Sequence, residues 1–248
     1  TWVYPIEDTF GVIFSVGDVS ANTYFRIAQQ SGGLVYVNFA NAGSTRWTVD
    51  TDSSALNLNE WNNLVLTHDG QEGVIYVNGQ IPAQTYSVTT DKTLWFGDVP
   101  LFDTANLGVL YQNSAYSNYF KGSIDNVQVW DRTLSAAEVL NLYNGSVNSS
   151  SYIGKYSNSG DFKSLVYYNS TSRYWNVSVS STDDSVYNNS IVNGSGVNIS
   201  CPNLVGYWNL DSNYDDSSSN GNDGTATGTN NATGLSSDAI RFDGVDDV

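Results

Sequence analysis

The chain has 248 residues, and its 25 Asp and Glu residues against 9 Lys and Arg residues give a formal net charge of −16. Such an acidic surface repels phosphate backbones and anionic membranes, which excludes nucleic acid as a partner. The single histidine and the single cysteine exclude a histidine-based metal site and an intrachain disulfide.

Residues 1–144 alternate short apolar runs with turn residues. Runs rich in Val, Ile, Tyr, Phe and Trp are separated by Gly, Asn, Asp and Ser, which is typical of antiparallel strands. The predicted strands are residues 2–6, 12–16, 24–28, 34–39, 46–49, 63–67, 74–77 and 124–130. Asn78 and Gly79 supply the positive φ angles that a hairpin turn needs. The pattern predicts an all-β fold, an antiparallel jelly-roll sandwich.

One helix is predicted, over residues 134–145. Ser135 is its expected N-cap, and Glu138 closes a capping box with Ser135. Gly145 suits the end of the helix. We therefore expect a single short helix at the C-terminal end of the sandwich.

The composition changes after this helix. Residues 146–202 are rich in Ser and Asn, and two stretches, residues 162–168 and 174–179, alternate in a way that favours a small β-module over a flexible tether. A new β pattern begins at Leu204. The chain therefore divides into three parts, residues 1–145, 146–202 and 203–248.

Two segments of the first part resemble a known family. Residues 122–135, with the sequence GSIDNVQVWDRTLS, followed by the predicted helix, resemble the last strand and closing helix of the laminin-G-like jelly rolls of the concanavalin A-like lectin/glucanase superfamily. Residues 61–65 and 76–79 resemble the central hairpin of that family, although the family commonly has Asp where this chain has Asn78. The resemblance covers residues 1–145.

The third part resembles the opening strands and loops of the same family. Residues 207–211, 216–224 and 242–247 carry this likeness. The resemblance thus implies a jelly roll that lacks its first strands over residues 1–145 and the opening strands of a jelly roll over residues 203–248.

This order allows three arrangements. The chain is a window of a tandem repeat, or residues 203–248 complete a neighbouring chain by strand complementation, or they fold back on their own chain as a circular permutation. A sandwich without its first strands exposes edges and an apolar face. We expect a repeat or a neighbouring chain to supply these strands, which makes further copies of the chain the predicted partner.

Sequons of the form Asn-X-Ser/Thr predict glycans on exposed loops and a location outside the cell or on its surface. No apolar run approaches the roughly 20 residues of a transmembrane helix, so we expect no membrane insertion. The acceptor residues are Asn144, Asn148, Asn169, Asn176, Asn188, Asn193, Asn198 and Asn231.

Calcium is the predicted cofactor, because carboxylate and amide oxygens are the ligands of hard cations. The resemblance implies that Asp125 stands where related folds often place a calcium carboxylate, and that a loop with Asp211, Asp216 and Asn222 faces it. The alternative is that Asp125 binds local backbone and that the loop is a solvated turn.

Aromatic side chains in loops are the candidates for stacking on sugars. These are Trp47, Trp95, Tyr111, Tyr116 and Tyr119. Four other tryptophans lie in strand motifs and are expected in the core, namely Trp2, Trp61, Trp130 and Trp208.

No catalytic constellation is predicted. Glycoside hydrolysis needs two carboxyl groups about 5 to 10 Å apart, and none of the four glutamates belongs to a closely spaced acidic strand motif. We therefore expect a non-catalytic extracellular structural or adhesive module, glycosylated and assembling head-to-tail into a filament or tandem array. The alternative is a calcium-dependent carbohydrate-binding module, in which glycans are the partners.

Overall fold

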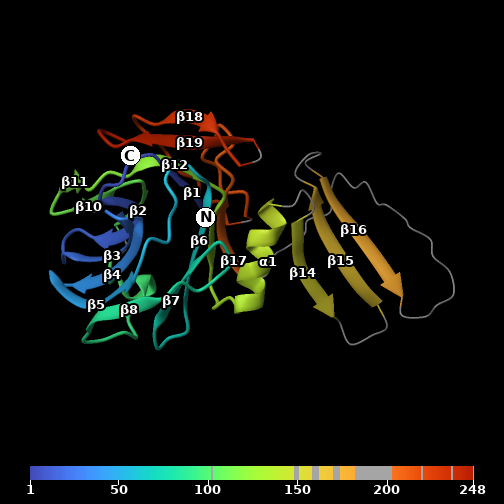
Figure 1. Ribbon diagram of the computed structural model, residues 1–248, viewed down its shortest axis with the longest axis horizontal. Coiled ribbons are helices and arrows are strands. Elements are labelled where there is room, and N and C mark those ends of the chain that lie inside the picture. Colours follow the sequence, from blue (N-terminus) through green and yellow to red (C-terminus); the bar gives the residue numbers. More distant parts are fainter. Residues whose placement is uncertain are drawn as a thin grey trace. The chain divides into compact units, whose positions relative to one another are not determined.

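The computed structural model describes residues 1–101, 103–147, 151–157, 162–169, 174–181, 203–218, 220–235 and 237–247. The chain forms two units (Figure 1). The first comprises Thr1–Leu134 with Pro202–Val248, and the second comprises Ser135–Cys201. The predicted fold class is confirmed, because antiparallel strands build both units and only one α-helix occurs among the described residues.

Two sheets of six strands form the sandwich of the first unit. The strand order in one sheet is β18 (Asn230–Thr233), β19 (Asp238–Asp243), β12 (Lys121–Asp125), β1 (Trp2–Pro5), β6 (Asn62–His68) and β7 (Gly73–Val77). The order in the other sheet is β8 (Gln84–Thr89), β5 (Ser44–Thr51), β4 (Leu34–Asn41), β3 (Thr23–Gln30), β2 (Gly11–Asp18) and β9 (Thr104–Leu107).

Two shorter ladders complete this unit. They pair β10 (Leu110–Gln112) with β11 (Ala115–Ser117), and β13 (Val127–Trp130) with β17 (Leu204–Trp208). A short 3₁₀ helix, η1 (Phe96–Asp98), precedes β9. Strands β8 to β11 were not predicted, because their runs are short and interrupted by polar residues.

The core lies between the two sheets and follows the period of two of a strand. In β4, Val35, Val37 and Phe39 are fully buried, and they meet residues such as Val3 and Ile124 of the other sheet in one apolar cluster. Burying a side chain of this kind stabilises the fold by roughly 1.5–3 kcal/mol. The alternation in the sequence is therefore what brings the two sheets together.

Residues 203–248 lie in the sheets of their own chain. β19 pairs with β12 in a register that runs from Lys121 opposite Asp243 to Ile124 opposite Ile240. β17 pairs with β13. Within one chain these pairings correspond to the third of the three arrangements, the fold-back as a circular permutation, and complementation by a repeat or neighbouring chain stays a prediction. The pairing with β19 covers an edge of β12 that would otherwise be open, which removes the cost that had favoured an external partner.

The predicted turn follows β7 and is closed by a bridge between Val77 and Gln80, although β7 and β8 themselves lie in different sheets. Asn78 and Gly79 have φ angles of 51° and 74°. The Asn78 side chain connects the turn to β6, because its Oδ1 accepts a hydrogen bond from the Asn63 N–H at 2.8 Å.

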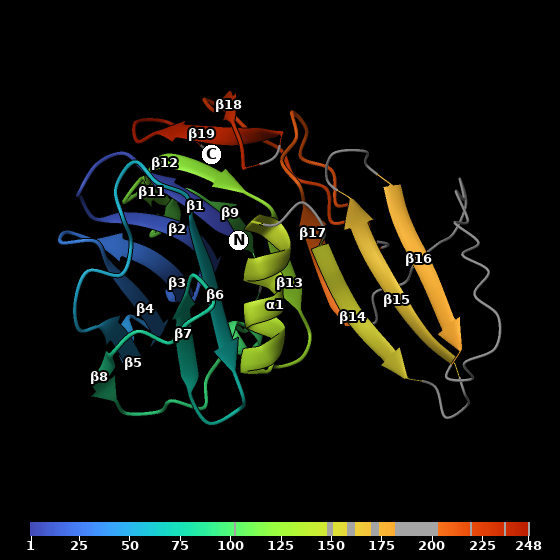
Figure 2. The ribbon, with the colours of Figure 1, turned by 45° about the vertical axis from the view of Figure 1, so that its right-hand side comes forward.

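The second unit begins with the predicted helix, α1 (Ala136–Val147). Its capping box is formed, since Glu138 Oε2 accepts the Ser135 N–H at 2.9 Å and Ser135 Oγ accepts the Glu138 N–H at 3.3 Å. A sheet of three antiparallel strands follows, made of β14 (Ser151–Ser157), β15 (Phe162–Asn169) and β16 (Tyr174–Ser181), as Figure 2 shows. Both strands predicted here are present, and β14 adds a third.

Candidate functional site

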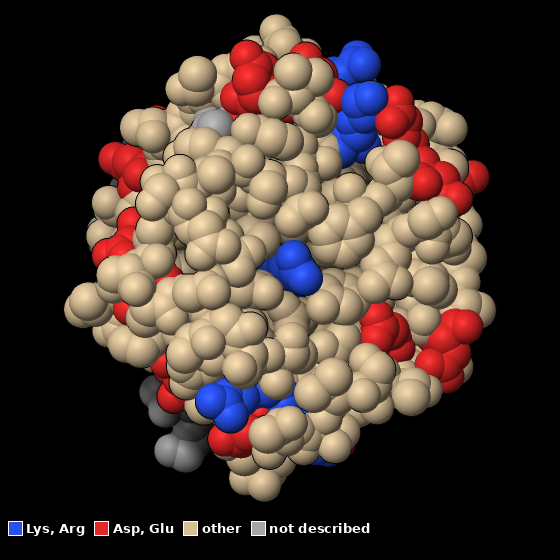
Figure 3. Space-filling model, turned by 90° about the vertical axis from the view of Figure 1, so that its left-hand side faces the viewer, with Lys and Arg blue, Asp and Glu red and all other residues tan. Residues whose placement is uncertain are grey.

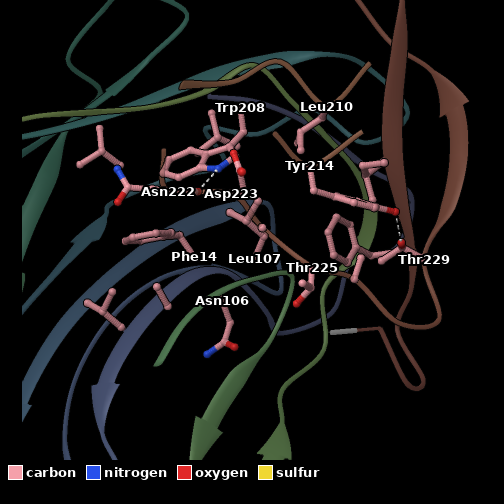
Figure 4. Close-up of a pocket in the computed structure, with 18 of the residues that line it drawn as sticks. Phe14, Asn106, Leu107, Trp208, Leu210, Tyr214, Asn222, Asp223, Thr225 and Thr229 are labelled. Carbon is pink, nitrogen blue, oxygen red and sulfur yellow. Dashed lines mark hydrogen bonds between the residues drawn. The ribbon is translucent and has the colours of Figure 1, made fainter. Parts of the chain in front are cut away.

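A cavity of about 590 Å³ lies between the sheets of the first unit (Figure 4). Strands β2 and β9 line it from one sheet, and β19 lines it from the other. The β13–β17 ladder and the loop of residues 222–226 complete its wall. The site therefore combines segments that are more than a hundred residues apart in the sequence.

Trp208 stands in this wall with its ring held at two points. The indole Nε1–H donates a hydrogen bond to the Asn222 carbonyl at 2.8 Å (Figure 4). The ring also lies directly over Gly206, because a Cβ built on that glycine would be 2.3 Å from Trp208 Cη2. Fixing an aromatic ring before a ligand arrives reduces the entropy cost of binding.

Tyr214 and Phe14 add two further rings to the lining. The Tyr214 hydroxyl is 3.0 Å from Thr229 Oγ1, which orients the phenol along the pocket (Figure 4). Phe14 comes from β2, whose sheet lies across the pocket from the sheet that contains β19. Together with Trp208, these rings give the pocket aromatic walls that face one another.

Polar groups are placed among the rings. Asn222, Asp223 and Thr225 come from one exposed loop, and Asn106 comes from β9. Asn106 Nδ2 is buried and has no hydrogen-bond partner among the described residues. A buried polar group that stays unpaired costs about 1–3 kcal/mol, so this amide lacks a partner that buried polar groups usually have.

Asp216 organises the loop that carries Asn222. Its carboxylate accepts the N–H groups of Tyr207, Ser218 and Asn222, each at 2.9 Å. Desolvation opposes ionisation, but these hydrogen bonds outweigh it and lower the pKa of Asp216 to about 2. The loop is therefore tied to an ionised carboxylate at neutral pH.

Asp125 occupies a different environment, at the end of β12. It is 1% exposed, and its carboxylate accepts the Leu235 N–H at 2.9 Å and the Asn126 side-chain amide at 2.8 Å. Burial raises the pKa of Asp125 to about 7, and the negative charge of Asp211 adds to this rise.

The structure divides the predicted calcium ligands into two pairs. Asp216 and Asn222 bind each other through a hydrogen bond of 3.1 Å, whereas Asp125 has Asp211 as its acidic neighbour. In the part of the chain that the structure describes, the three aspartates do not form a group whose oxygens lie within 4.8 Å of one another. Asp216 binds the backbone of its own loop, as the alternative has it, whereas Asp125 binds the distant Leu235 N–H and the Asn126 side chain.

The predicted sugar-binding aromatics are scattered. The prediction for Trp47 was wrong. This residue lies in β5 and not in a loop, and it is fully buried, so it cannot stack on a ligand. Trp95 packs on Phe25 and His68, with ring centroids 5.0 and 4.8 Å apart. Of the five, only Tyr116 lines the pocket.

The other two predicted aromatics belong to the region around the β10–β11 hairpin. Tyr111 packs on Tyr116 at 4.6 Å between ring centroids, and Tyr119 forms a bridge with Val12. Trp208, which the sequence placed in the core, packs against the core cluster and also lines the pocket. Only the small residue at Gly206, two positions before Trp208, could have indicated that its ring lies open to a cavity.

Two sequon asparagines are seen as exposed side chains. Asn144 lies on α1, and Asn231 lies on β18, where its amide donates to Ser212 Oγ at 3.0 Å. Asn169 and Asn176 lie in β15 and β16. The remaining four lie outside the described residues, namely Asn148, Asn188, Asn193 and Asn198.

A second feature is an arginine on β3 that is surrounded by rings. The Arg26 Cζ lies 5.4, 5.4 and 5.2 Å from the ring centroids of Phe10, Tyr24 and Tyr36. Figure 3 shows one face of the molecule as mostly uncharged, with few basic side chains and with acidic ones chiefly toward its edge. Arg26 is therefore a candidate contact for a ligand outside the pocket.

None of the helices among the described residues combines the length and apolar character needed to cross a bilayer.

The fold and the cavity define a jelly-roll β-sandwich with a ligand-sized pocket between its sheets. A laminin G family model, described as the Concanavalin A-like lectin/glucanases superfamily, matches residues 1–140. The chain belongs to this superfamily, and the resemblance noted in residues 1–145 is confirmed over the matched range. No curated protein sequence matches the chain.

Solved structures with similar folds come from several sources. The CBM40 of the Ruminococcus gnavus IT-sialidase is 20% identical, with 56% of this chain and 77% of that chain covered and a TM-score of 0.48. A heptameric SAP-like pentraxin from Limulus polyphemus is 17% identical, with 73% and 80% covered and a TM-score of 0.45. The leech intramolecular trans-sialidase is 15% identical, with 75% and 32% covered and a TM-score of 0.48.

Proposed function

We propose that the chain is a non-catalytic module that binds carbohydrate in the pocket between its sheets. One observation carries this proposal, namely that the Trp208 ring and the unpartnered Asn106 amide line the same cavity. Membership of a superfamily described by its lectins and glucanases supports the class of ligand.

The chemistry of the pocket suits a saccharide. A sugar ring has apolar C–H faces bordered by hydroxyl groups, so it needs aromatic surface and hydrogen-bonding groups side by side. Trp208 and Tyr214 supply the aromatic surface of the pocket. The hydrogen-bonding groups belong to Asn106, Asn222 and Thr225. Its volume of about 590 Å³ falls within the range of roughly 300–1,000 Å³ that is usual for small-molecule sites.

The number of carboxyl groups in the pocket favours binding without hydrolysis. Of the residues that line the pocket, all of which the structure describes, only Asp223 carries a carboxyl group. Two-carboxylate glycosidases use a pair of such groups. We therefore assign the pocket to recognition, with a neutral glycan as the preferred ligand, because the net charge of −16 repels acidic sugars.

A glycan array tests the proposal, followed by titration calorimetry on the sugars that bind. Trp208→Ala and Asn106→Ala are expected to weaken binding by about 1–3 kcal/mol each. Trp61→Ala is the matched control, because Trp61 is a half-buried tryptophan that does not line the pocket. Loss of binding in Arg26→Ala with full binding in Trp208→Ala would move the site to the surface of β3 and contradict the proposal.

A second function, adhesion through self-assembly, is favoured by the permuted chain order. The strands β17 to β19 are separated from their partner strands in the same sandwich by the whole second unit. The same pairings can therefore form between two chains that exchange residues 203–248. Head-to-tail exchange of this kind would build the filament that we expected from the sequence.

Exchange is tested by cysteine cross-linking in a Cys201→Ser background. Ser123 and Arg241 are register partners in β12 and β19. A mixture of Ser123→Cys and Arg241→Cys chains yields a disulfide-linked dimer if the segments exchange. A monomer that cross-links only when one chain carries both substitutions would show fold-back alone.

An extracellular location is part of the same proposal. The exposed side chains of Asn144 and Asn231 support glycan attachment at these sequons. Treatment of the native protein with an endoglycosidase should lower its mass, whereas an unchanged mass would argue against glycosylation.

A further inference from the structure

Three carboxylates gather in the turn that follows β19. Asp243, Asp246 and Asp247 each offer an oxygen, and these oxygens lie within 4.8 Å of one another. Asp243 and Asp246 are exposed, whereas Asp247 has no exposed surface. A fully buried carboxylate beside two others is unusual, because like charges at this separation repel.

The turn leaves one oxygen of Asp247 without a partner. Asp247 Oδ2 accepts the N–H groups of Asp243 and Gly244 at 2.6 and 2.9 Å. Asp247 Oδ1 is buried and has no hydrogen-bond partner among the described residues. The Asp243 carboxyl group lies close enough to Asp247 to interact with it directly. The unpaired oxygen thus belongs to a carboxylate of the cluster.

No basic side chain of the described residues neutralises this cluster. Lys121 stands opposite Asp243 in the register of β12 and β19, and its methylene groups lie over Gly244. Its ammonium group instead pairs with Glu7, at 2.8 Å. The three carboxylates are therefore uncompensated in a chain whose net charge is already −16.

We propose that Asp243, Asp246 and Asp247 hold a divalent cation of the calcium class. Carboxylate oxygens are the preferred ligands of this hard ion, and an ion bound here offsets the repulsion and satisfies the unpaired oxygen of Asp247. The site lies apart from the carbohydrate pocket, which none of the three residues lines. It adjoins the end of β19, so the ion also stabilises the attachment of residues 203–248 to β12.

Calorimetric titration of the full chain with calcium chloride, after treatment with a chelator, is the test. One bound ion is expected, and Asp246→Asn should weaken its binding by about tenfold or more. Asp246 suits this substitution because it is exposed and its side chain accepts none of the hydrogen bonds of the turn. Asp131→Asn is the matched control, since it removes the same charge from another exposed position and should leave the affinity unchanged.

Two further measurements separate the alternatives. Calcium should raise the unfolding temperature of the native chain and of Asp131→Asn more than that of Asp246→Asn. Asp247 is intact in all three chains, so the comparison does not depend on whether variants of this buried residue fold. Absence of calcium binding would overturn the proposal. So would binding that Asp211→Asn removes and Asp246→Asn leaves intact, because the ion would then lie near Asp125.

Discussion

Phe242 lies against Gly108 so closely that a Cβ built on the glycine would be 2.2 Å from Phe242 Cδ1. Phe242 comes from β19 and is 2% exposed, and Gly108 lies in the turn between β9 and β10 with a φ angle of 74°. The contact joins the last part of the sequence to the first across the core. It explains why residues 203–248 are an integral part of this sandwich.

Gly108→Ala should therefore destabilise the fold through both a clash and a strained backbone. The expected loss is about 2–4 kcal/mol, measured by urea unfolding. Gly221→Ala is the matched control, since its φ angle is 71° and no atom lies within 4 Å of its Cβ. Equal losses in the two variants would show that the contact with Phe242 contributes nothing.

The stability of the chain should depend on the ionisation of Asp125. The folded state raises the pKa of this buried carboxyl from 3.8 to about 7, so it binds a proton more tightly than the unfolded chain. The free energy of unfolding should therefore fall as the pH rises from about 4 to about 7, by roughly 4 kcal/mol at most. Asp211 is the charged side chain that acts on it.

Urea unfolding across this pH range checks the prediction, with Asp125→Asn as the comparison. The amide does not ionise, so the difference in stability between the two chains should change over the window from pH 4 to 7. A difference that stays constant would show that Asp125 ionises as freely in the folded state as in the unfolded chain.

Asp216 should stabilise the pocket loop in the opposite pH direction. Its pKa is lowered to about 2, so its contribution is present above about pH 4 and is lost as the pH falls toward 2. Asp216→Ala leaves the N–H groups of Tyr207 and Asn222 without their acceptor, which should cost about 1–3 kcal/mol and weaken sugar binding. Asp215→Ala, one residue earlier and exposed, should change neither quantity.

Gly206→Ala tests whether the position of the Trp208 ring matters for binding. The added Cβ would meet the far end of the indole, so the ring must turn away from its place in the wall. We expect a loss of sugar affinity close to that of Trp208→Ala, with a stability change of about 1 kcal/mol or less. Gly97→Ala has open space around its Cβ and should bind normally.

The elements set by local pattern could be predicted from the sequence. The run of apolar and aromatic residues in β4 indicated a strand, and the Ser135 and Glu138 pair indicated the start of the helix. The pocket could not be predicted in the same way. Asn106 and Trp208 come together only through the permuted pairing of β13 with β17, and no local signal in either segment reports that contact.

The acidic residues show the same limit. Asp125 was interpreted as a calcium ligand from its motif, and the motif gave no sign that the Leu235 N–H, from a segment far along the chain, donates a hydrogen bond to its Oδ2. Conversely, the sequence FDGVDD displays the aspartates of the turn after β19 without showing that Asp247 is buried. Burial and long-range hydrogen bonds decide which carboxylates are free, and neither is encoded in spacing.

The central claim, that sugar binds between the sheets against Trp208, is tested most directly by fluorine NMR. The seven tryptophans can be labelled as 5-fluorotryptophan, and Trp208→Phe assigns the resonance of interest. Addition of a sugar selected on the array should shift the Trp208 resonance while that of Trp47, fully buried in the core, stays unchanged. A bound sugar that leaves the Trp208 resonance in place would contradict this account.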